Sequence, residues 1–477
     1  MNNLKRTLAL VATLALAATA FVGCGDDETS STASKADTTS KSDTESKEDD
    51  KTESKEEDAK AELTVPDTGD VMSILGWNAS EVGGMIDVFV KNNKGGYTAD
   101  QVKYVEQGTS GGEAAQKYAT YFSSGDDCDL FIAEADWILT YINNDEYSAP
   151  LSNLGITEAD FADAYAYTVS IAKDNNGVLK GASWQAAAGG YCYRTDLAKD
   201  YLGVTTPEEM QAKVDDWDKF MESAATVAEA SSGKTAMTAT IGGMWQVYSY
   251  NRDQAWVVDN KLTIDDSCTE FMNICKDMKD KGYVTSAQQW AEDGSWYAIG
   301  QDDSTLGYFF STWCLVDDAM LQNASGGKDG KTYGKWNICV GPTEYCWGGS
   351  WLCLSPNADN GSIAQSFVKF FTTDADTMKI YATEKNEFVN NKKAMKEIVD
   401  SGEHKNALLG GQDQFAVLMD AAAGIDLEGK ITKDDSTIKA NYIEAVNGYV
   451  DGTYATVDDA LAAFKEATAG DLPDLAW

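Results

Sequence analysis

The chain has very little of what enzymes and metal sites most often use. Its 477 residues include a single histidine, His404, which lies in the polar stretch "SGEHKNALL". A Ser-His-Asp or Cys-His nucleophile system would have to use that one imidazole, and a zinc site with two histidines is excluded. The sequence also has no Cys-x-x-Cys pair, the usual signature of a structural zinc site. We therefore predict no metal and no cofactor, and we interpret His404 as a solvated residue at a helix edge.

Basic residues are scarce as well. Lysine and arginine total 38 against 77 aspartates and glutamates, which gives a formal charge of −39. So large a negative charge repels phosphate backbones and anionic lipid surfaces. We therefore expect no nucleic-acid partner. The length of the chain and its 43% hydrophobic residues are nevertheless sufficient for two or more domains with real cores.

Cysteine spacing excludes local disulfides. Eight of the nine cysteines lie beyond Cys24, an even number that suggests disulfides in an exported protein. Cys268 and Cys275 lie in a stretch with helical periodicity, which puts their backbones about 10 Å apart, beyond the reach of a disulfide. Cys346 and Cys353, on one expected strand, lie farther apart still. We therefore expect mostly buried free thiols, with long-range disulfides as the alternative.

The first 24 residues are typical of a secretory signal. Lys5 and Arg6 precede a run of leucine, alanine and valine, which leads to Cys24 in "FVGC". This ending resembles the lipobox of bacterial lipoproteins, whose cysteine is lipidated and becomes N-terminal after cleavage. We predict a signal peptide at 1–23 and lipidation of Cys24. Cleavage after Ala20 is the alternative.

A long polar segment follows the signal. From Gly25 to Glu62 the only apolar side chains are alanines, so the segment cannot bury enough surface to offset chain entropy. We predict a disordered acidic tether at 24–66. Its length allows it to hold a folded domain clear of a cell wall.

After Pro66, short apolar runs alternate with amphipathic stretches. The spacing predicts strands at 71–75, 102–106 and 128–136, with helices at 81–93 and 111–125 between them. This order is typical of a largely parallel sheet with helices on both faces. Ligands bind such sheets at the carboxyl ends of the strands. The residues at these ends are Trp77, Asn78, Glu134, Asp136 and Trp137.

The rest of the chain predicts a second group of elements. These are two strand-like pieces within 177–202, helices at 208–230 and 267–282, a hairpin at 255–264, a strand at 304–311, and a mainly helical tail from residue 362.

The motif "WGGSW" at 347–351 is unusual for the strand in which we place it. There Trp347, Gly349 and Trp351 would share one face, with the two indoles about 13 Å apart. Gly349 would leave open space between the rings. The motif alone does not distinguish contact with a ligand from packing.

Several stretches, taken in order, resemble the extracellular solute-binding proteins of ABC sugar importers, the family that includes maltose- and oligosaccharide-binding proteins. They are "CDLFIAEADWILTYINNDEYSAPLSNLG", "GASWQAAAGGYCYRTDLAKDYLGVTTPEEMQAKVDDWDKFMESA", "STLGYFFSTWCLVDDAM" and "WGGSWLCLSPNADNGSIAQSFVKFFTTDADTMKIYA". The first is similar to the family's segment in which a strand ends in sugar-contacting residues. The other three resemble segments in which the chain crosses between lobes. The family often has Gly-x-Pro at the first crossing, where this chain has Gly181, Ala182 and Ser183.

The resemblance extends from about residue 67 to 477 and implies an α/β fold of the periplasmic-binding-protein type (type II). Such a fold has two lobes, hinge-crossing strands and a ligand cleft between the lobes. We assign 67–182 plus 311–345 to lobe 1, and 183–310 plus 346–477 to lobe 2. The ligand-binding residues that the resemblance implies are Trp77, Asn78, Glu134, Asp136, Trp137, Trp184, Trp245, Trp313, Trp347, Gly349 and Trp351.

These residue types suit a sugar. A sugar ring has a face of C–H groups, on which an indole stacks, and hydroxyl edges, which carboxylates and amides bind. Each type also has a structural alternative. Any tryptophan can belong to the core, Glu134 and Asp136 can stabilise a helix N-terminus, and Asn78 can cap the next helix.

We therefore predict a monomeric binding protein, not an enzyme, anchored by lipid to the outer face of the bacterial cytoplasmic membrane. It would close its lobes over a mono- or oligosaccharide and deliver it to the permease subunits of an ABC transporter. The alternatives are an exported glycoside hydrolase with a carboxylate pair, a peptide- or amino-acid-binding lipoprotein of the same fold, and a surface adhesin.

Overall fold

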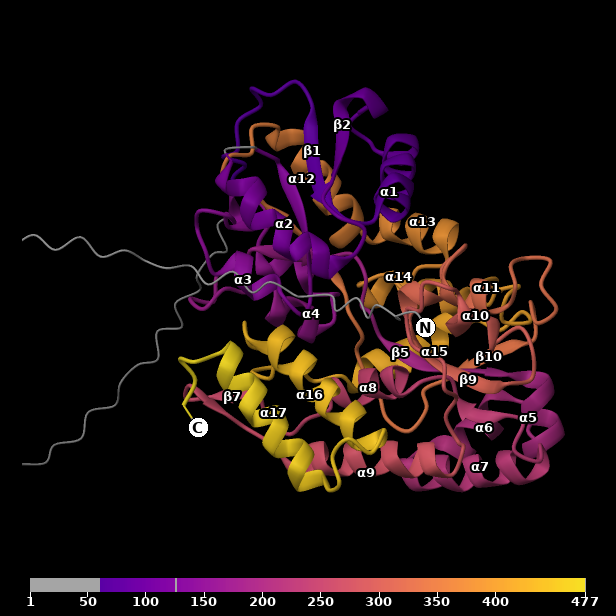
Figure 1. Ribbon diagram of the computed structural model, residues 1–477. Coiled ribbons are helices and arrows are strands. Elements are labelled where there is room, and N and C mark those ends of the chain that lie inside the picture. The colour runs from indigo at the N-terminus through magenta and orange to yellow at the C-terminus, as the bar shows by residue number, and fades with distance from the viewer. Residues whose placement is uncertain (1–60, 125–126, 477) are drawn as a thin grey trace, which may run out of the picture. The chain divides into compact units, whose positions relative to one another are not determined.

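The structure is a computed structural model that describes residues 61–124 and 127–476 (Figure 1). The predicted signal peptide at 1–23, the lipidation at Cys24 and the tether up to residue 60 lie outside the described residues. Residues 61–66 belong to the folded part rather than to the predicted tether. Leu63 pairs with Leu154, and the N–H of Gly361 donates to the carbonyl of Pro66, because the apolar side chains at the end of this segment pack on the core.

The first sheet has the strand order β2-β1-β3-β11-β4. Its strands are β1 (Met72–Gly76), β2 (Val102–Glu106), β3 (Leu130–Glu134), β4 (Gly181–Ser183) and β11 (Ser350–Leu354). β1 runs parallel to β2 and β3, whereas β11 is antiparallel to β3 and β4. The three predicted strands are confirmed, and the sheet is parallel in the half that they form.

β3 is buried along almost its whole length. A strand of this kind has to be covered on both faces, and helices provide the cover. The helices with which the first sheet is associated are α1 (Ala79–Asn92), α2 (Gly111–Ser123), α3 (Ile138–Ile142), α4 (Ala166–Ile171), α12 (Gly361–Thr372) and α13 (Ala375–Lys385). α1 and α12 meet through Phe89 and Phe367, whose ring centroids are 5.1 Å apart. On α2, the buried Tyr118 donates its hydroxyl to carbonyls of β1 and β3.

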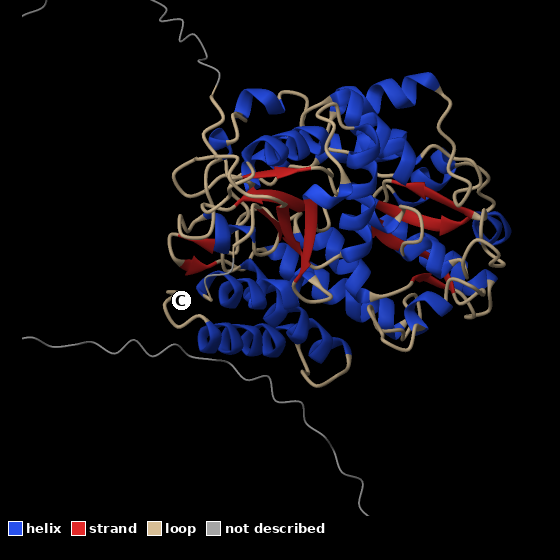
Figure 2. Cartoon of the chain, turned by 90° about the horizontal axis from the view of Figure 1, so that it is seen from above, coloured by secondary structure: helices blue, strands red, loops and turns tan. Residues whose placement is uncertain are grey.

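The second sheet has the order β10-β5-β9-β6. Its strands are β5 (Gly189–Arg194), β6 (Ala236–Thr238), β9 (Thr305–Ser311) and β10 (Trp336–Cys339). Its neighbouring helices are α5 (Thr195–Leu202), α6 (Pro207–Val214), α7 (Trp217–Ala230), α8 (Ile241–Ser249), α9 (Asp266–Asp280), α10 (Ser295–Ala298), α11 (Met320–Ala324) and α15 (Gln414–Gly424). Tyr191, Phe220 and Phe309 form an aromatic cluster against this sheet, with ring centroids 5.1 to 5.5 Å apart. Figure 2 shows the two sheets as separate groups of strands, with helices around each.

The chain passes from the first sheet to the second after β4 and back to the first after β10, and it returns to the second sheet after α13, where α15 packs against β5. The crossing segments are tied together by backbone contacts: Gln185 pairs with Val389, and Ala188 pairs with Cys346. Tyr345 donates its hydroxyl to the carbonyls of Gly190 and Phe310, which holds the crossing segment that leads to β11 against the second sheet.

The lobe boundaries differ from those expected. β10 lies within 311–345, which we assigned to lobe 1, but it pairs with β5 in the second sheet. β11 and α12 lie within 346–477, which we assigned to lobe 2, but they belong to the first sheet and its helical cover. The physical reason is that the fully buried β11 fits between β3 and β4, so the chain crosses over after β10 and not before it.

The C-terminal part is helical, as predicted. It contains α14 (Lys392–Ser401), α16 (Asp435–Val450) and α17 (Val457–Asp471). α16 packs on the second lobe, where Tyr442 lies 5.1 Å from Trp245 between ring centroids. The end of the chain joins the predicted hairpin of β7 (Val257–Val258) and β8 (Lys261–Leu262), because Ala476 pairs with Lys261.

Two further predictions can be compared with the structure. All eight cysteines of the described residues are free and buried, so the prediction of buried thiols is confirmed. His404 is half-buried rather than solvated, because its ring stacks on Phe415 with centroids 4.2 Å apart.

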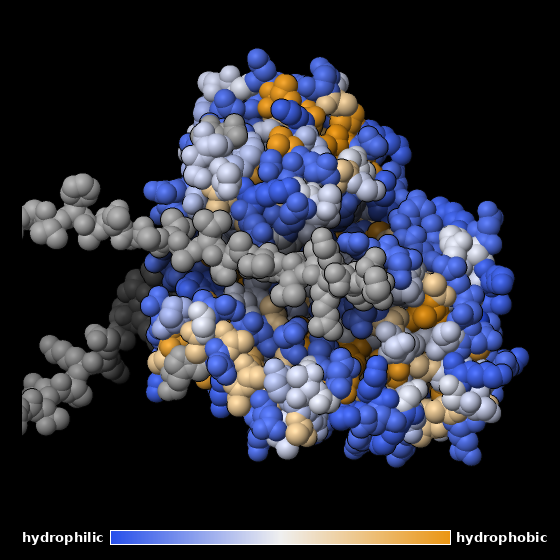
Figure 3. Space-filling model, viewed as in Figure 1, coloured by the Kyte–Doolittle hydropathy of each residue, from blue (hydrophilic) through white to orange (hydrophobic). Residues whose placement is uncertain are grey.

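None of the helices in the described part is both long and apolar enough to cross a membrane, and the face drawn in Figure 3 is mainly hydrophilic.

Candidate functional site

The carboxyl ends of β1 and β3 bring two tryptophans together. Trp77 and Trp137 meet edge to face with centroids 5.6 Å apart, and Trp77 is partly exposed. A Cβ atom on Gly111, at the start of α2, would lie 3.6 to 3.7 Å from both indoles. Trp137 is 6% exposed, and its indole N–H has no partner among the described residues. An unpaired buried N–H is costly, so this end of the sheet offers a donor to an incoming acceptor.

Asp136 connects the two lobes. Its Oδ1 accepts hydrogen bonds from the Tyr250 hydroxyl at 2.7 Å and from Lys439 Nζ at 2.6 Å. Both donors come from the second lobe, at the end of α8 and in α16, and the Lys439 ammonium also lies 3.8 Å from the centre of the Tyr250 ring. Burial would raise the pKa of Asp136, but the charge of Lys439 holds it below its usual value. We call Asp136, Tyr250 and Lys439 the interlobe clasp.

Glu134, two residues before Asp136, is held differently. Its Oε2 accepts the backbone N–H of Asp136, at 3.0 Å, and it forms no direct ion pair with any described residue, although the charge of Lys439 acts on it. Burial, and then the negative charge of Asp136, raise the pKa of Glu134 well above its usual value. The residue is partly exposed, so a ligand can reach its carboxyl group.

Three tryptophans gather where the segment after β9 meets the crossing segment that leads to β11. Trp313 donates its indole N–H to the carbonyl of Trp347 at 2.9 Å, and the two rings lie 5.0 Å apart in an edge-to-face arrangement. Trp290, which is 50% exposed, lies nearly parallel to Trp313 with centroids 6.2 Å apart. A Cβ atom on Gly348 would lie 3.3 Å from Trp313 Nε1 and 3.6 Å from Glu134 Oε1. Gly348 therefore lies in close contact with both an indole and a carboxyl group, and a larger residue there would be crowded against them.

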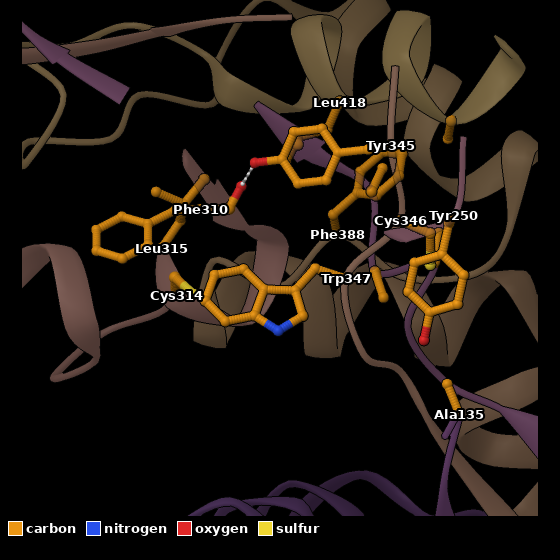
Figure 4. Packing of buried hydrophobic residues seen from close by; sticks show 14 of the residues in the cluster. Ala135, Tyr250, Phe310, Cys314, Leu315, Tyr345, Cys346, Trp347, Phe388 and Leu418 are labelled. Carbon is orange, nitrogen blue, oxygen red and sulfur yellow. Dashed lines mark hydrogen bonds between the residues drawn. The ribbon is translucent and has the colours of Figure 1, made fainter. Parts of the chain in front are cut away.

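Figure 4 shows the packing that fixes Trp347. Its ring lies beside Cys314, on the side of the buried cluster that contains Tyr345 and Phe310. The hydroxyl of Tyr250 is directed toward Ala135, next to Asp136. The tryptophan group and the interlobe clasp are therefore parts of one region.

The strand predicted around "WGGSW" begins only at Ser350. Gly348 and Gly349 have φ of +70° and +110°, a region that favours glycine and turns the chain. Trp347 and Trp351 therefore do not share a strand face as predicted. Trp351 is 1% exposed and donates its N–H to the carbonyl of Thr168 at 2.8 Å. Gly349 packs against this ring, since a Cβ atom there would lie 3.1 Å from it.

A second carboxyl pair lies where α1 begins. Trp184 is 1% exposed and donates its indole N–H to Glu81 Oε1 at 3.2 Å. Burial raises the pKa of Glu81 to about 7, and burial together with the charge of Glu81 raises the pKa of Glu387 to about 8. Glu387 is 1% exposed and accepts from the Thr312 hydroxyl. Neither glutamate forms an ion pair with a described residue.

Asn78 lies at the border of this arrangement, and Trp245 lies outside it. Asn78 caps α1, with its side-chain oxygen accepting the N–H of Glu81 at 3.2 Å, and its amide nitrogen donates to Glu81 Oε2 at 3.0 Å. Trp245 is 8% exposed and packs against Phe271 and Tyr442 inside the second lobe. The structure thus places Trp245 beneath the surface and brings the other predicted residues toward the strand ends and crossing segments.

Sequence reasoning missed several members of the region. Trp290, Glu81, Glu387, Tyr250 and Lys439 come from loops and helix ends that carry no motif. For Trp290 a signal existed in "QQWAEDGSW", since a tryptophan among polar and turn residues has no obvious core to join. No group of three or more histidines, cysteines or acids in the described part could hold a metal ion.

A separate cavity of about 840 Å³ lies elsewhere on the second lobe. It is lined by residues near the start of β6 and by the loop that follows α9, including Lys234, Thr285 and Ser295. None of the predicted site residues lines it.

Comparisons with known proteins agree with this architecture. A family model described as "Bacterial extracellular solute-binding protein" matches residues 85–407. No curated protein matches the sequence. Among solved structures, an extracellular solute-binding protein of family 1 is 17% identical, with a TM-score of 0.68 over 84% of this chain and 100% of that chain.

Two other solved structures contain bound sugars. The ABC transporter associated binding protein from B. animalis subsp. lactis, in complex with β-1,6-galactobiose, is 16% identical, with a TM-score of 0.65 over 84% of this chain and 97% of that one. The galacto-N-biose/lacto-N-biose I-binding protein from Bifidobacterium longum, in complex with lacto-N-biose, is 16% identical, with a TM-score of 0.64 over 86% and 98%. At these identities the likeness concerns the fold, and it confirms the predicted two-lobe α/β architecture.

Proposed function

The chain belongs to the bacterial extracellular solute-binding protein family, and from this we propose that it binds a mono- or oligosaccharide for an ABC importer. One observation carries the proposal. The half-exposed Trp290 lies parallel to Trp313, and Trp313 and Glu134 both lie against Gly348. Aromatic faces next to a free carboxyl oxygen match the C–H face and the hydroxyl edge of a sugar ring.

In this proposal the residues have different roles in binding. Trp290, Trp313 and Trp347 supply ring faces, Glu134 accepts from hydroxyls, and the unpaired N–H of Trp137 donates to one. Trp77 and Asn78 extend the site along the edge of the first sheet, and Trp184 orients Glu81. Asp136 belongs to the site through the clasp. Gly349, Trp351 and Trp245 support the site from beneath.

Bound ligands in similar folds support a sugar. Proteins with this fold hold β-1,6-galactobiose and lacto-N-biose, and both belong to ABC transporters by their descriptions. We extend to this chain the role of delivering the sugar to a membrane permease. The sugar is held when the lobes close, so binding selects a closed population.

The test is calorimetric titration of the purified protein with mono- and oligosaccharides, followed by chromatography of the recovered sugar. We expect at least one saccharide to bind and to be recovered unchanged. Shortened chains would favour the exported glycoside hydrolase, with Glu134 and Asp136 as its carboxylate pair. Binding of peptides or amino acids alone would favour a peptide-binding protein of the same fold.

The location is part of the proposal. We propose that the chain is a monomer held on the outer face of the cytoplasmic membrane by lipid on Cys24. Replacing that cysteine, Cys24→Ala, should move the protein from the membrane fraction to the medium, whereas Cys128→Ala, a buried thiol, should leave it in place. Retention of the Cys24→Ala protein on membranes would contradict lipidation there.

A further inference from the structure

The irregular segment at 286–294, between α9 and α10, carries the half-exposed Trp290 (Figure 1). Just before it, the N–H of Thr285 donates to the carbonyl of Thr238. Just after it, α10 contains the buried Trp296. Among the described residues, 286–294 form hydrogen bonds only within 285–298. This segment, which we call the Trp290 loop, is therefore hydrogen-bonded to the rest of the molecule only through its ends.

The Trp290 loop is also loosely packed on one side. The cavity of about 840 Å³ on the second lobe is bordered by loop residues that include Ser286, Gln288 and Ala291. These residues therefore have solvent space beside them where a core segment would have packed side chains. Segments with few contacts and few hydrogen bonds to their surroundings open at a low cost in free energy. The loop can thus move while the second sheet stays in place.

The backbone of Trp290 itself is strained. Its φ is +64°, in the left-handed region that is unfavourable for a large side chain. Such a conformation persists only where surrounding contacts hold it. The contacts here are between rings: Trp290 lies within 9° of parallel to Trp313, with centroids 6.2 Å apart, and its ring meets those of Trp296 and Trp347 at steep angles. A change in this one backbone angle would release the strain and move the indole away from Trp313.

Trp313, by contrast, is fixed. It donates its indole N–H to the carbonyl of Trp347 at 2.9 Å, and its ring lies against Gly348. Trp290 and Trp313 are therefore a movable and a fixed ring face, parallel to each other. A sugar ring between them needs carbon contacts on both sides, which separates the two indoles by about 7 to 8 Å. Trp290 would have to move outward by at least about 1 Å to admit it.

We propose, building on the carbohydrate function proposed above, that a pyranose ring inserts between Trp290 and Trp313 and that the Trp290 loop closes over it. Such a site selects a sugar with C–H groups on both faces. In β-glucose and β-xylose every ring substituent is equatorial, so both faces present C–H groups to an indole. Galactose and mannose each have one axial hydroxyl, which makes one face polar and costly to bury against a ring. The ligand class is therefore a β-linked sugar with equatorial hydroxyls.

Four methyl β-glycosides provide the test, namely those of glucose, xylose, galactose and mannose. Calorimetric titration of the full-length protein with these sugars, and with their β-1,4-linked disaccharides, measures the preference. We expect the glucose and xylose compounds to bind at least about fivefold more tightly than the galactose and mannose compounds, as the loss of one stacking face implies.

The outcomes separate the two claims. Equal or tighter binding of the galactose or mannose compounds would overturn the insertion between two indoles and leave carbohydrate binding in place. Binding confined to α-linked saccharides would have the same meaning. No binding of any mono- or oligosaccharide would overturn both.

A matched pair of variants locates the selection. In Trp290→Ala only the face of Trp313 remains, so the preference for the glucoside over the galactoside should fall to near parity, mainly through weaker binding of the glucoside. Trp217 is another partly buried indole of the second lobe, stacked on Tyr248 with centroids 4.9 Å apart, and Trp217→Ala should keep the preference. An unaltered preference in Trp290→Ala would overturn the assignment.

Hydrogen exchange of the unmodified protein tests the closure without any variant. The amides of 286–294 should exchange rapidly in the free protein and more slowly with saturating cellobiose, because the closed loop is held on both sides of the sugar. The loop at 326–331, between α11 and β10, should exchange equally in both states. Unchanged exchange of 286–294 on saturation would show that the Trp290 loop does not close over the ligand.

Discussion

Individual carboxyl groups near the site differ in how their charge is balanced. Asp136 has an ammonium and a phenol as partners, whereas Glu387 is buried, accepts from the Thr312 hydroxyl, and forms no ion pair with a described residue. A carboxyl group buried without a cation keeps its proton to higher pH. The folded protein therefore carries protons near neutral pH that the unfolded chain has already released.

We expect the ligand-free protein to lose stability as the pH rises from about 5 to about 8. An ordinary glutamate releases its proton near pH 4.3, whereas the pKa of Glu387 is raised to about 8, first by burial and then by the charge of Glu81. The folded state binds more protons than the unfolded state in this window, so the free energy of unfolding falls as the pH rises.

Urea denaturation at pH 5, 6.5 and 8 measures this slope. Glu387→Gln cannot ionise and should flatten it, whereas the exposed control Glu466→Gln should leave it unchanged. A free energy of unfolding that rises over the same range would show that Glu387 is ionised in the folded protein.

Trp290 provides a prediction about binding. Half of its surface is exposed but its ring contacts Trp296, Trp313 and Trp347, so Trp290→Ala should lower the free energy of unfolding by about 1 kcal/mol. It should weaken saccharide binding by about 1 to 2 kcal/mol, roughly five- to thirtyfold, since a stacking face is lost. Trp290→Phe keeps a ring and should recover part of the affinity in calorimetric titration. Full affinity in the alanine variant would remove Trp290 from the site.

At the scale of strands and helices, local patterns predicted most elements but not their partners. The strands at 102–106 and 304–311 and the hairpin at 255–264 are confirmed almost to the residue, because alternation and turn residues are local properties. β11 pairs with β3, although more than 200 residues separate them in the sequence. This pairing depends on the assembled sheet, so no local pattern predicts it.

The candidate site shows the same division. The predicted residues at the strand ends and crossings came from motifs and from the family resemblance, and they lie where strands end. Lys439 could not be predicted, since it is one of many lysines in the sequence and only its contact with Asp136 gives it a role. The turn at "WGGSW" was misread because two adjacent glycines allow both a strand and a left-handed turn.

The turn itself can be tested. Gly349→Ala would place a Cβ atom 3.1 Å from the Trp351 ring at φ of +110°, so we expect a loss of about 1 to 3 kcal/mol in the free energy of unfolding. Gly83→Ala is the matched control, because a Cβ atom on this glycine of α1 would meet nothing within 4 Å. That change should stabilise the protein slightly, by about 0.5 to 1 kcal/mol. Equal effects of the two substitutions in denaturation would mean that the turn is not strained by a side chain.

For the molecule as a whole, the clasp is the contact that links binding to closure. It joins Asp136 of the first lobe directly to Tyr250 and Lys439 of the second. Part of the cost of bringing the lobes together is thus offset by the protein itself. Such a protein would present an already assembled site to its ligand more often than one without the contact.

Lys439→Met should therefore shift the ligand-free protein toward open forms. Removing the ammonium breaks the ion pair that joins Asp136 to the second lobe, which favours separation of the lobes. Small-angle scattering should show a larger radius of gyration without ligand and the original value with saturating saccharide. Lys281→Met, which removes an exposed pair with Asp277, should leave the radius unchanged. An unchanged radius in Lys439→Met would mean that the clasp does not hold the lobes.

The two ends of the folded part belong to different lobes. The segment at 61–66 is attached to the first lobe through Leu63 and Leu154, and Ala476 is attached to the second through Lys261. Fluorescent donor and acceptor proteins fused at these ends would therefore be attached to different lobes. A change in energy transfer between them would report sugar binding without any label inside the molecule.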